Sequence, residues 1–263
     1  MKFLRFINPN DDKDLKSGLY NGEKVIELKG DVLDYFKNED KIKESTLESY
    51  SLEDIEIQSP VNPSKIVCIG LNYKDHAKEL NLELPDTPVI FLKANSTLNK
   101  TESKIIYPKI SKQVDYEGEL AIVIGAKTKQ VSPEEAKGHI FGYTIINDVT
   151  ARDFTLNDGQ WVRGKSCDGF APIGPFIETE MDPLNQRIVT KVDDEIKQDS
   201  NTKNMIFTPY EIVSYISQSM TLYPGDVIAT GTPPGVGPMD AGSTVEVYIE
   251  DIGTLKNYLI KEK

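Results

Sequence analysis

Two glutamates, Glu117 and Glu119, lie two residues apart in VDYEGELAIVIG (residues 114–125), a stretch otherwise typical of a buried strand. Because side chains alternate along a strand, this spacing predicts that both carboxylates point to one face. Two carboxylates about 5 Å apart repel by roughly 3 kcal/mol at an effective dielectric near 20. A solvated strand leaves them in water, whereas a buried strand requires a proton, a basic side chain or a metal ion beside them.

A third carboxylate, Asp148, directly follows an apolar stretch that we predict to be a strand, FGYTIIND. An acid in this place often only caps the next segment, but beside Glu117 and Glu119 it would complete a site of three carboxylates. The chain has two histidines and two cysteines, so a zinc site rich in these residues cannot be built. Any metal site must consist mostly of oxygen ligands, which suit Mg²⁺, Mn²⁺ or Ca²⁺.

The segment GLNYKDHAKELN contains His76 and Glu79, three residues apart on what we predict to be a short helix. Residues at this spacing share a helix face. The two side chains either pair on a solvated surface, or Glu79 orients His76 as a general base.

Residues 159–166, GQWVRGKS, match the Walker A pattern of P-loop nucleotide-binding proteins. A P-loop follows a buried strand and opens a helix, whereas RDFTLND before this stretch is polar and CDGFAPIGPF after it contains helix breakers. Nucleotide binding is therefore the unfavoured alternative, and Lys165 is a candidate cation for another site. Farther along, the glycine beside Thr232 in TGTPPGVG either forms a rigid turn or lets the backbone approach a carboxylate.

Composition limits the class of protein. The 263 residues include 42 acidic and 30 basic side chains, for a formal net charge of −12, which argues against nucleic acid and anionic membranes as partners. No apolar run is long enough to span a membrane, and the start MKFLRFINPNDD turns polar too soon for a signal peptide. Together with two isolated cysteines, Cys68 and Cys167, these features predict a cytoplasmic protein with reduced thiols.

The pattern of apolar residues predicts two parts. Residues 1–60 are expected to form a small α+β domain with a hairpin at Asn21-Gly22 and a helix over residues 31–46. SPVNPSK marks the boundary, and residues 61–263 are expected to be the catalytic domain, mainly β with short helices. Ser132 and Thr208 each begin a predicted helix with proline next and glutamate three residues on. The predicted strands of this domain are KIVCIGL, PVIFLK, ELAIVIG, FGYTIIND, PIGPFIE, RIVTKV, DVIATG and TVEVYIE.

Five segments in order resemble the fumarylacetoacetate hydrolase family, over about residues 65–248. They are GLNYKDHAKEL, VDYEGELAIVIG, INDVTARD, WVRGKSCDGFAPIGP and TGTPPGVG. The resemblance implies a mixed β-sandwich roll, a divalent metal that is usually Mg²⁺ or Mn²⁺, and a homodimer. The first sixty residues are similar to the variable N-terminal piece that many members carry.

Residue by residue, the resemblance implies three sets of site residues. The metal carboxylates match Glu117, Glu119 and Asp148, and the catalytic residues match His76, Glu79 and Lys165. The substrate-binding positions match Gly231, Thr232, Arg152 and Thr155. Many relatives have glutamine where this chain has Thr155, and an aromatic residue where it has Cys167, so a hydrolytic mechanism does not carry over directly.

The resemblance implies an enzyme that acts on a small 2-oxo acid or its enol through a metal-stabilised enolate. Cleavage of a carbon–carbon bond is the favoured reaction, either by hydrolysis of an acylpyruvate or by decarboxylation of oxaloacetate. Isomerisation of a 2-hydroxy-diene-dioate is the alternative within the family. Because His76 and Glu79 lie on a polar segment with few apolar anchors, we also expect residues 72–86 to form a mobile lid.

Overall fold

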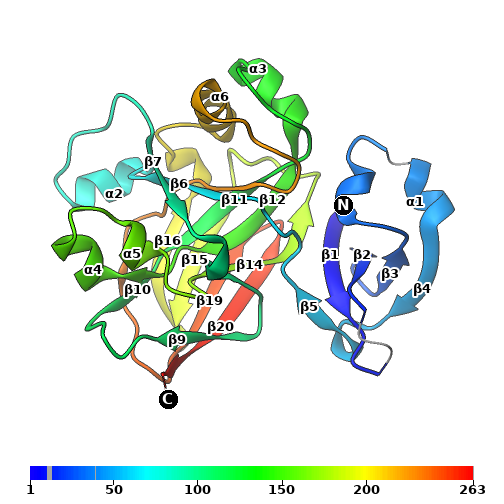
Figure 1. Ribbon diagram of the computed structural model, residues 1–263, viewed down its shortest axis with the longest axis horizontal. Coiled ribbons are helices and arrows are strands. Elements are labelled where there is room, and N and C mark those ends of the chain that lie inside the picture. The colour runs from blue at the N-terminus through cyan, green and yellow to red at the C-terminus, as the bar shows by residue number, and fades with distance from the viewer. Residues whose placement is uncertain (11–13, 39, 263) are drawn as a thin grey trace.

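The computed structural model describes residues 1–10, 14–38 and 40–262. These residues form mostly β structure with short helices, as the sequence predicts. They contain a twelve-stranded sheet, a five-stranded sheet and a three-stranded sheet. A large body holds most of the strands, and a smaller lobe, coloured blue in Figure 1, is built from the N-terminal residues.

The N-terminal lobe is an antiparallel sheet that continues into the body. The predicted hairpin forms, but not with a two-residue turn at Asn21-Gly22: Tyr20 lies opposite Val25, so residues 21–24 make the loop. The Asn21 side chain accepts hydrogen bonds from the backbone N–H groups of Glu23 and Lys24 in this loop. The first strand pairs with a strand of the body, where Lys2 lies opposite Glu178. The strands of the lobe are β1 (Lys2–Ile7), β2 (Lys16–Tyr20), β3 (Val25–Leu28), β4 (Thr46–Tyr50) and β5 (Glu56–Gln58).

The single helix predicted over residues 31–46 is wrong. A 3-10 helix over Val32–Tyr35 begins with a capping box from Asp31, and a separate helix, α1 (Asp40–Ser45), follows it. Lys37 between them has a φ of +54°, a left-handed conformation that no α-helix contains. The apolar residues whose spacing suggests one helix belong to two short helical elements, and they pack against strands of the lobe.

The body's central sheet joins the lobe through β1 and ends at β7 (Val89–Lys93). Both of its faces are buried: on β11, Leu120 and Ile122 enter one core, while Ala121 and Val123 enter the other. This double burial explains why these strands are continuous apolar runs. From the lobe outward the strands are β14 (Ala171–Glu178), β12 (Ile140–Asn147), β11 (Gly118–Ile124), β17 (Val227–Ala229), β6 (Ile66–Gly70) and β7, with β8 (Leu98–Asn99) beside β14.

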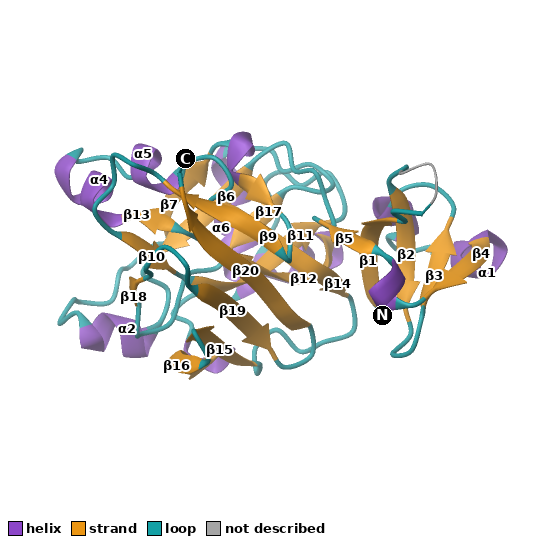
Figure 2. Ribbon diagram, turned by 90° about the horizontal axis from the view of Figure 1, so that it is seen from below, coloured by secondary structure: helices purple, strands orange, loops and turns teal. Residues whose placement is uncertain are grey.

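A five-stranded sheet packs across the central sheet and closes the sandwich, as Figure 2 shows from below. Ile188, Val247 and Leu255 of this sheet join Leu120 of β11 in one core. Its strands are β16 (Glu195–Asn201), β15 (Arg187–Val192), β19 (Thr244–Ile249), β20 (Gly253–Lys261) and β9 (Ser103–Tyr107). Strands β9, β16 and β20 are absent from the sequence predictions.

The helices are short and lie at the edges of the sheets. The predicted capping boxes at Ser132 and Thr208 are both confirmed, at the starts of α3 (Pro133–Ala136) and α6 (Pro209–Ser219). No helix in the described part of the chain is long and apolar enough to cross a membrane. Further 3-10 helices span Leu52–Asp54, Asn95–Thr97, Lys137–His139 and Thr202–Asn204.

One side of the body, at the left of Figure 1, gathers the elements that surround the candidate site. They are α2 (Lys74–Glu79), α4 (Arg152–Asn157), α5 (Val162–Lys165) and a small sheet of β10 (Val114–Tyr116), β13 (Thr150–Ala151) and β18 (Gly237–Pro238).

Candidate active site

A cleft of about 490 Å³ lies between α2, the ends of β6 and β7, the α4–α5 segment and the strands β10 and β11. Its polar wall includes His76, Glu117, Glu119 and Lys165. Apolar side chains line the cleft beside these polar groups, and the centroid of the Phe91 ring lies 5.1 Å from Lys165 Nζ. They are Ile69, Leu71, Leu80, Leu82, Phe91, Trp161 and Val236.

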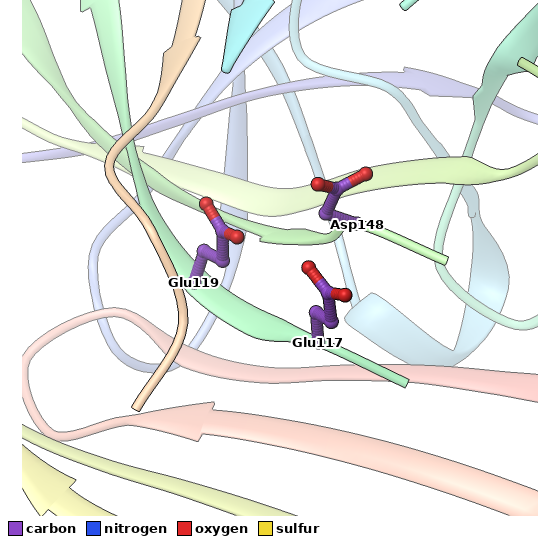
Figure 3. Close-up of side chains that lie close together, drawn as sticks. All are labelled: Glu117, Glu119 and Asp148. Carbon is purple, nitrogen blue, oxygen red and sulfur yellow. The ribbon is translucent and has the colours of Figure 1, made fainter. Parts of the chain in front are cut away.

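Glu117 and Glu119 line this cleft, and the fully buried Asp148 lies beside them, so that the three carboxylates come close together, as Figure 3 shows. The candidate ligand oxygens of Glu117, Glu119 and Asp148 all lie within 4.8 Å of one another. The pairing of β11 with β12 produces this arrangement, because it sets Gly118 opposite Asn147 and so brings Asp148 beside the two glutamates. Glu119 and Asp148 are almost completely buried and Glu117 is 7% exposed, so water does not separate their charges.

The continuous strand predicted over residues 114–125 is interrupted at Glu117. Residues 114–116 form β10 in the small three-stranded sheet, and β11 begins at Gly118 in the central sheet. The backbone N–H of Glu117 donates to the side chain of Asn147, and that of Gly118 donates to the side chain of Gln198, which satisfies the polar groups at the break. Glu117 therefore lies in the junction between two sheets.

Lys165 lies between two of the carboxylates. Its Nζ is 2.6 Å from Glu117 Oε2 and 2.7 Å from Asp148 Oδ2. Burial alone would lower the pKa of Lys165, but Asp148 and Glu117 outweigh that effect and raise it, so the ammonium stays charged. The sequence-predicted role of Lys165 as a site cation thus has a structural basis.

Lys93 at the end of β7 was not foreseen as a site residue. Its Nζ donates to Asp148 Oδ1 at 2.6 Å and to the carbonyl of Val149 at 3.0 Å. Burial alone would raise the pKa of Asp148, but Lys165 and Lys93 together lower it. Asp148 is therefore an ionised carboxylate held by two buried ammonium groups.

Arg152, at the start of α4, is the third cation described that contacts these carboxylates. It donates to Asp115 Oδ2 at 2.7 Å and to Glu117 Oε1 at 2.5 Å. The cluster thus holds four carboxylates, of Asp115, Glu117, Glu119 and Asp148, and three cations, of Lys93, Lys165 and Arg152, which leaves one net negative charge among the described residues.

Glu119 has the least compensated charge of the three. Burial and the neighbouring charges of Asp148 and Glu117 raise its pKa well above the ordinary value, while a backbone hydrogen bond from Gly231, at 2.7 Å, opposes this in part. A hard divalent cation fits this surplus of negative charge and an all-oxygen donor set. Mg²⁺ or Mn²⁺, as expected from the sequence, meets both requirements.

His76 and Glu79 form a pair on α2 at the rim of the same cleft. His76 Nδ1 lies 2.8 Å from Glu79 Oε2, which leaves Nε2 as the nitrogen able to exchange a proton with a ligand. The backbone N–H of Gly235 also donates to Glu79 Oε1, at 3.1 Å. At the other end of the helix, Asp75 accepts hydrogen bonds from Ser200 and Asn204. The segment is thus anchored at both ends by polar contacts that its sequence does not reveal.

Of the remaining predicted residues, Thr155 and Thr232 line the cleft and Gly231 adjoins Thr232, but the two hydroxyl groups and the N–H of Gly231 are already engaged. Thr232 donates to the carbonyl of Gly118 and accepts from Gln198 Nε2 at 2.8 Å. The Thr155 hydroxyl donates to the carbonyl of Arg152 within α4, at 2.8 Å. The N–H of Gly231 is committed to Glu119. Their predicted role in binding substrate stays a prediction.

The Walker A-like stretch forms no phosphate-binding loop. Lys165 ends the four-residue helix α5 instead of preceding a helix, and its ammonium faces carboxylates. Trp161 in this stretch packs edge-on to Phe91, with ring centroids 5.3 Å apart, and forms part of the apolar wall. Cys167 and the buried Cys68 are both free thiols.

Comparison with known proteins adds four findings. The family model described as fumarylacetoacetate (FAA) hydrolase C-terminal matches residues 65–260. An uncharacterized protein of Methanocaldococcus jannaschii is 55% identical over 226 residues, which are 86% of this chain and 93% of that protein. The mitochondrial oxaloacetate tautomerase Fahd2a of Rattus norvegicus is 41% identical over 209 residues, 75% of this chain and 67% of that protein. The structure of 5-carboxymethyl-2-hydroxymuconate delta-isomerase from Mycobacterium smegmatis is 36% identical, with a TM-score of 0.89 and coverage of 100% of both chains.

Proposed function

Because the chain belongs to the fumarylacetoacetate hydrolase family, we propose that it is a divalent-metal-dependent enzyme that moves a proton on a small 2-oxo acid. The reaction is the interconversion of keto and enol forms, with oxaloacetate as the model substrate. The observation that carries this proposal is that a His–Glu pair and a buried carboxylate cluster line one cleft.

Glu117, Glu119 and Asp148 would hold Mg²⁺ or Mn²⁺. When bound, such a cation supplies a Lewis acid that polarises the 2-oxo group and stabilises negative charge on its oxygen. Lys165 lines the same part of the cleft, so its ammonium offsets negative charge that develops on the substrate. Two sources of positive charge thus favour the enolate over the ketone.

His76 is the proposed proton carrier. The Glu79 carboxylate accepts a hydrogen bond from the Nδ1–H group of His76. This bond orients the ring and makes Nε2 the basic nitrogen. In the keto-to-enol direction Nε2 takes a proton from the carbon next to the 2-oxo group, and the enolate oxygen is then protonated by the imidazolium or by solvent. In the other direction the enol oxygen loses its proton and Nε2 gives a proton to the carbon. The rings of Phe91 and Trp161 add apolar surface to the cleft beside Lys165.

One observation favours proton transfer over hydrolysis. Hydrolysis requires a positioned water, and the hydroxyl of Thr155, where many relatives have glutamine, is turned back to its own helix. The names of similar proteins include a tautomerase and a delta-isomerase as well as a fumarylacetoacetate hydrolase. Carbon–carbon cleavage, favoured from the sequence, is the second candidate in the form of decarboxylation, because Lys165 would stabilise the same enolate without any attacking water.

The test uses freshly dissolved oxaloacetate with Mg²⁺ or Mn²⁺. Decay of the enol absorbance is followed directly, and pyruvate is measured in parallel by a coupled dehydrogenase. The proposal expects faster decay without pyruvate, and a loss of roughly 10²–10⁴ in rate for His76→Ala, the usual contribution of a positioned base. Pyruvate formed at the rate of enol decay would instead identify a decarboxylase. The proposal would be refuted if the enzyme, tested with Mg²⁺ and with Mn²⁺, did not speed the decay beyond that in buffer containing the same cation.

A further inference from the structure

The His76–Glu79 pair is joined to β10, the strand directly before Glu117, through the backbone of a single residue, Gly235. Tyr116, next to Glu117, donates its hydroxyl to the carbonyl of Gly235 at 2.6 Å. The N–H of Gly235 donates to Glu79, at 3.1 Å to Oε1 and 3.3 Å to Oε2. Glu79 in turn lies 2.8 Å from His76 Nδ1. Four residues therefore form a continuous relay from β10 to the proposed base.

Packing does not hold Glu79 in place. Its side chain is 43% exposed, and α2 has only six residues, too few to be rigid without external contacts. Asp75 anchors the first turn of the helix through Ser200 and Asn204, and neither of these residues bonds to Glu79 in the described part of the chain. The N–H of Gly235 is thus the fixed donor that selects one orientation of the Glu79 carboxylate, and through it one orientation of the His76 ring.

The backbone conformation of Gly235 is itself fixed. Gly235 has a φ of +94°, and a Cβ there would collide with the carbonyl oxygen of Lys197, so only glycine fits. Two residues later, Gly237 pairs with Tyr116 in the small three-stranded sheet. Tyr116 is 3% exposed and does not line the cleft. Its hydroxyl therefore acts on the loop, and reaches no ligand in the cleft.

We propose that Tyr116 is a positioning residue that sets the orientation of His76 through Gly235 and Glu79. This role rests on the proposed function, because it assigns Tyr116 an effect on His76 alone. This hydrogen bond also couples the carboxylate cluster to the His–Glu pair. Tyr116, in the segment directly before Glu117, fixes the loop at Gly235, and this loop holds Glu79 beside His76. A shift of this segment on ligand binding therefore moves both together.

The test is Tyr116→Phe, which removes the hydroxyl and keeps the ring. Tyr35→Phe is a matched control, because Tyr35 is also 3% exposed and donates to the carbonyl of Lys29 at 2.6 Å, but lies in the N-terminal lobe. We expect Tyr116→Phe to reduce kcat about 3- to 10-fold with unchanged KM, the effect of one lost positioning hydrogen bond. Tyr35→Phe should leave kcat and KM unchanged. It should lower the melting temperature by about as much as Tyr116→Phe does, because each variant loses one buried hydrogen bond.

A double-mutant cycle shows whether the effect passes through His76. In a His76→Ala background, Tyr116→Phe should cause no further loss, whereas an additive loss would overturn the relay. A His76→Ala enzyme with unchanged rates would instead refute the proposed function. A second measurement does not depend on activity: the ring ¹⁵N shifts of His76, one of only two histidines, report its tautomer. They should change in Tyr116→Phe and not in Tyr35→Phe, and an unchanged His76 spectrum in Tyr116→Phe refutes the relay whatever the rates.

Discussion

Replacing Glu119 with glutamine should stabilise the protein in the absence of divalent cations and abolish its response to them. The side chain is 1% exposed, and its pKa is raised by burial and by the charges of Asp148 and Glu117. Glutamine has the same shape and still offers an oxygen to the N–H of Gly231. The substitution removes the one net negative charge of the cluster without removing a hydrogen bond.

The magnitude follows from the geometry. With ligand oxygens within 4.8 Å of one another, a pair of carboxylates repels by about 3 kcal/mol at an effective dielectric near 20. Lys165 offsets part of this repulsion, so the expected gain is about 1–3 kcal/mol. For a chain of this size, that gain raises the melting temperature by roughly 2–6 °C. The wild type should gain about 2.7 kcal/mol at a cation concentration of 100 times Kd, and the variant almost nothing.

Thermal melts with chelator and with Mg²⁺ or Mn²⁺ measure both effects, and calorimetry gives the cation affinity directly. Asp226→Asn is the matched control, because Asp226 is a fully buried carboxylate that accepts hydrogen bonds from backbone N–H groups of Ser64, Lys65 and Tyr223. That variant should melt lower and keep its response to cations. A Glu119→Gln protein that melts lower than wild type, or that retains the full response to Mg²⁺, would show that the cluster is not a cation site.

Three further outcomes are expected. Lys165→Met should remove one of the two cations that contact each of Glu117 and Asp148, leave only Arg152 and Lys93 beside them, and cost about 3–5 kcal/mol of stability. Calorimetry should show no ATP binding to either wild type or variant; micromolar ATP binding lost in the variant would restore the P-loop alternative. Lys93→Met should cost a similar free energy of unfolding and weaken Mg²⁺ binding, because Asp148 loses the ammonium that fixes its orientation; unchanged Mg²⁺ affinity would contradict this role. Hydrogen exchange of residues 72–86 should slow when Mg²⁺ and oxalate are added, and equal protection in both states would reject the lid.

Strands buried on both faces were the easiest elements to predict. β6, β11 and β12 are unbroken apolar runs because each packs against a core on either side. Strand β16 was missed because its outer face is solvated and its sequence, EIKQDSN, has the composition of a polar loop. A strand of this kind is specified by its partner, here β15, which directly precedes it and pairs with it across the turn at Asp193-Asp194.

Site residues could be predicted where they belong to a sequence motif. Residues that reach the site only through the fold could not be predicted. Lys93 is a lysine at the end of a strand, and its partner Asp148 lies 55 residues away, so no local pattern links them. Gln198, on the missed strand β16, binds both Gly118 and Thr232 and was invisible for the same reason. These contacts arise from the packing of the two sheets, which a sequence period cannot report.

The error at Glu117 is the most informative, because it concerns the residues from which the cation site was predicted. A period of two correctly indicates that Glu117 and Glu119 act together, but it assumes one continuous strand. The chain instead changes sheets at Glu117, and this side chain contacts both Arg152, at the start of α4, and Lys165, at the end of α5. Glu119 stays within the central sheet and has no such cation bonded to it, so its charge is the less compensated of the two. The break in the strand thus creates the unequal pair that favours a divalent cation.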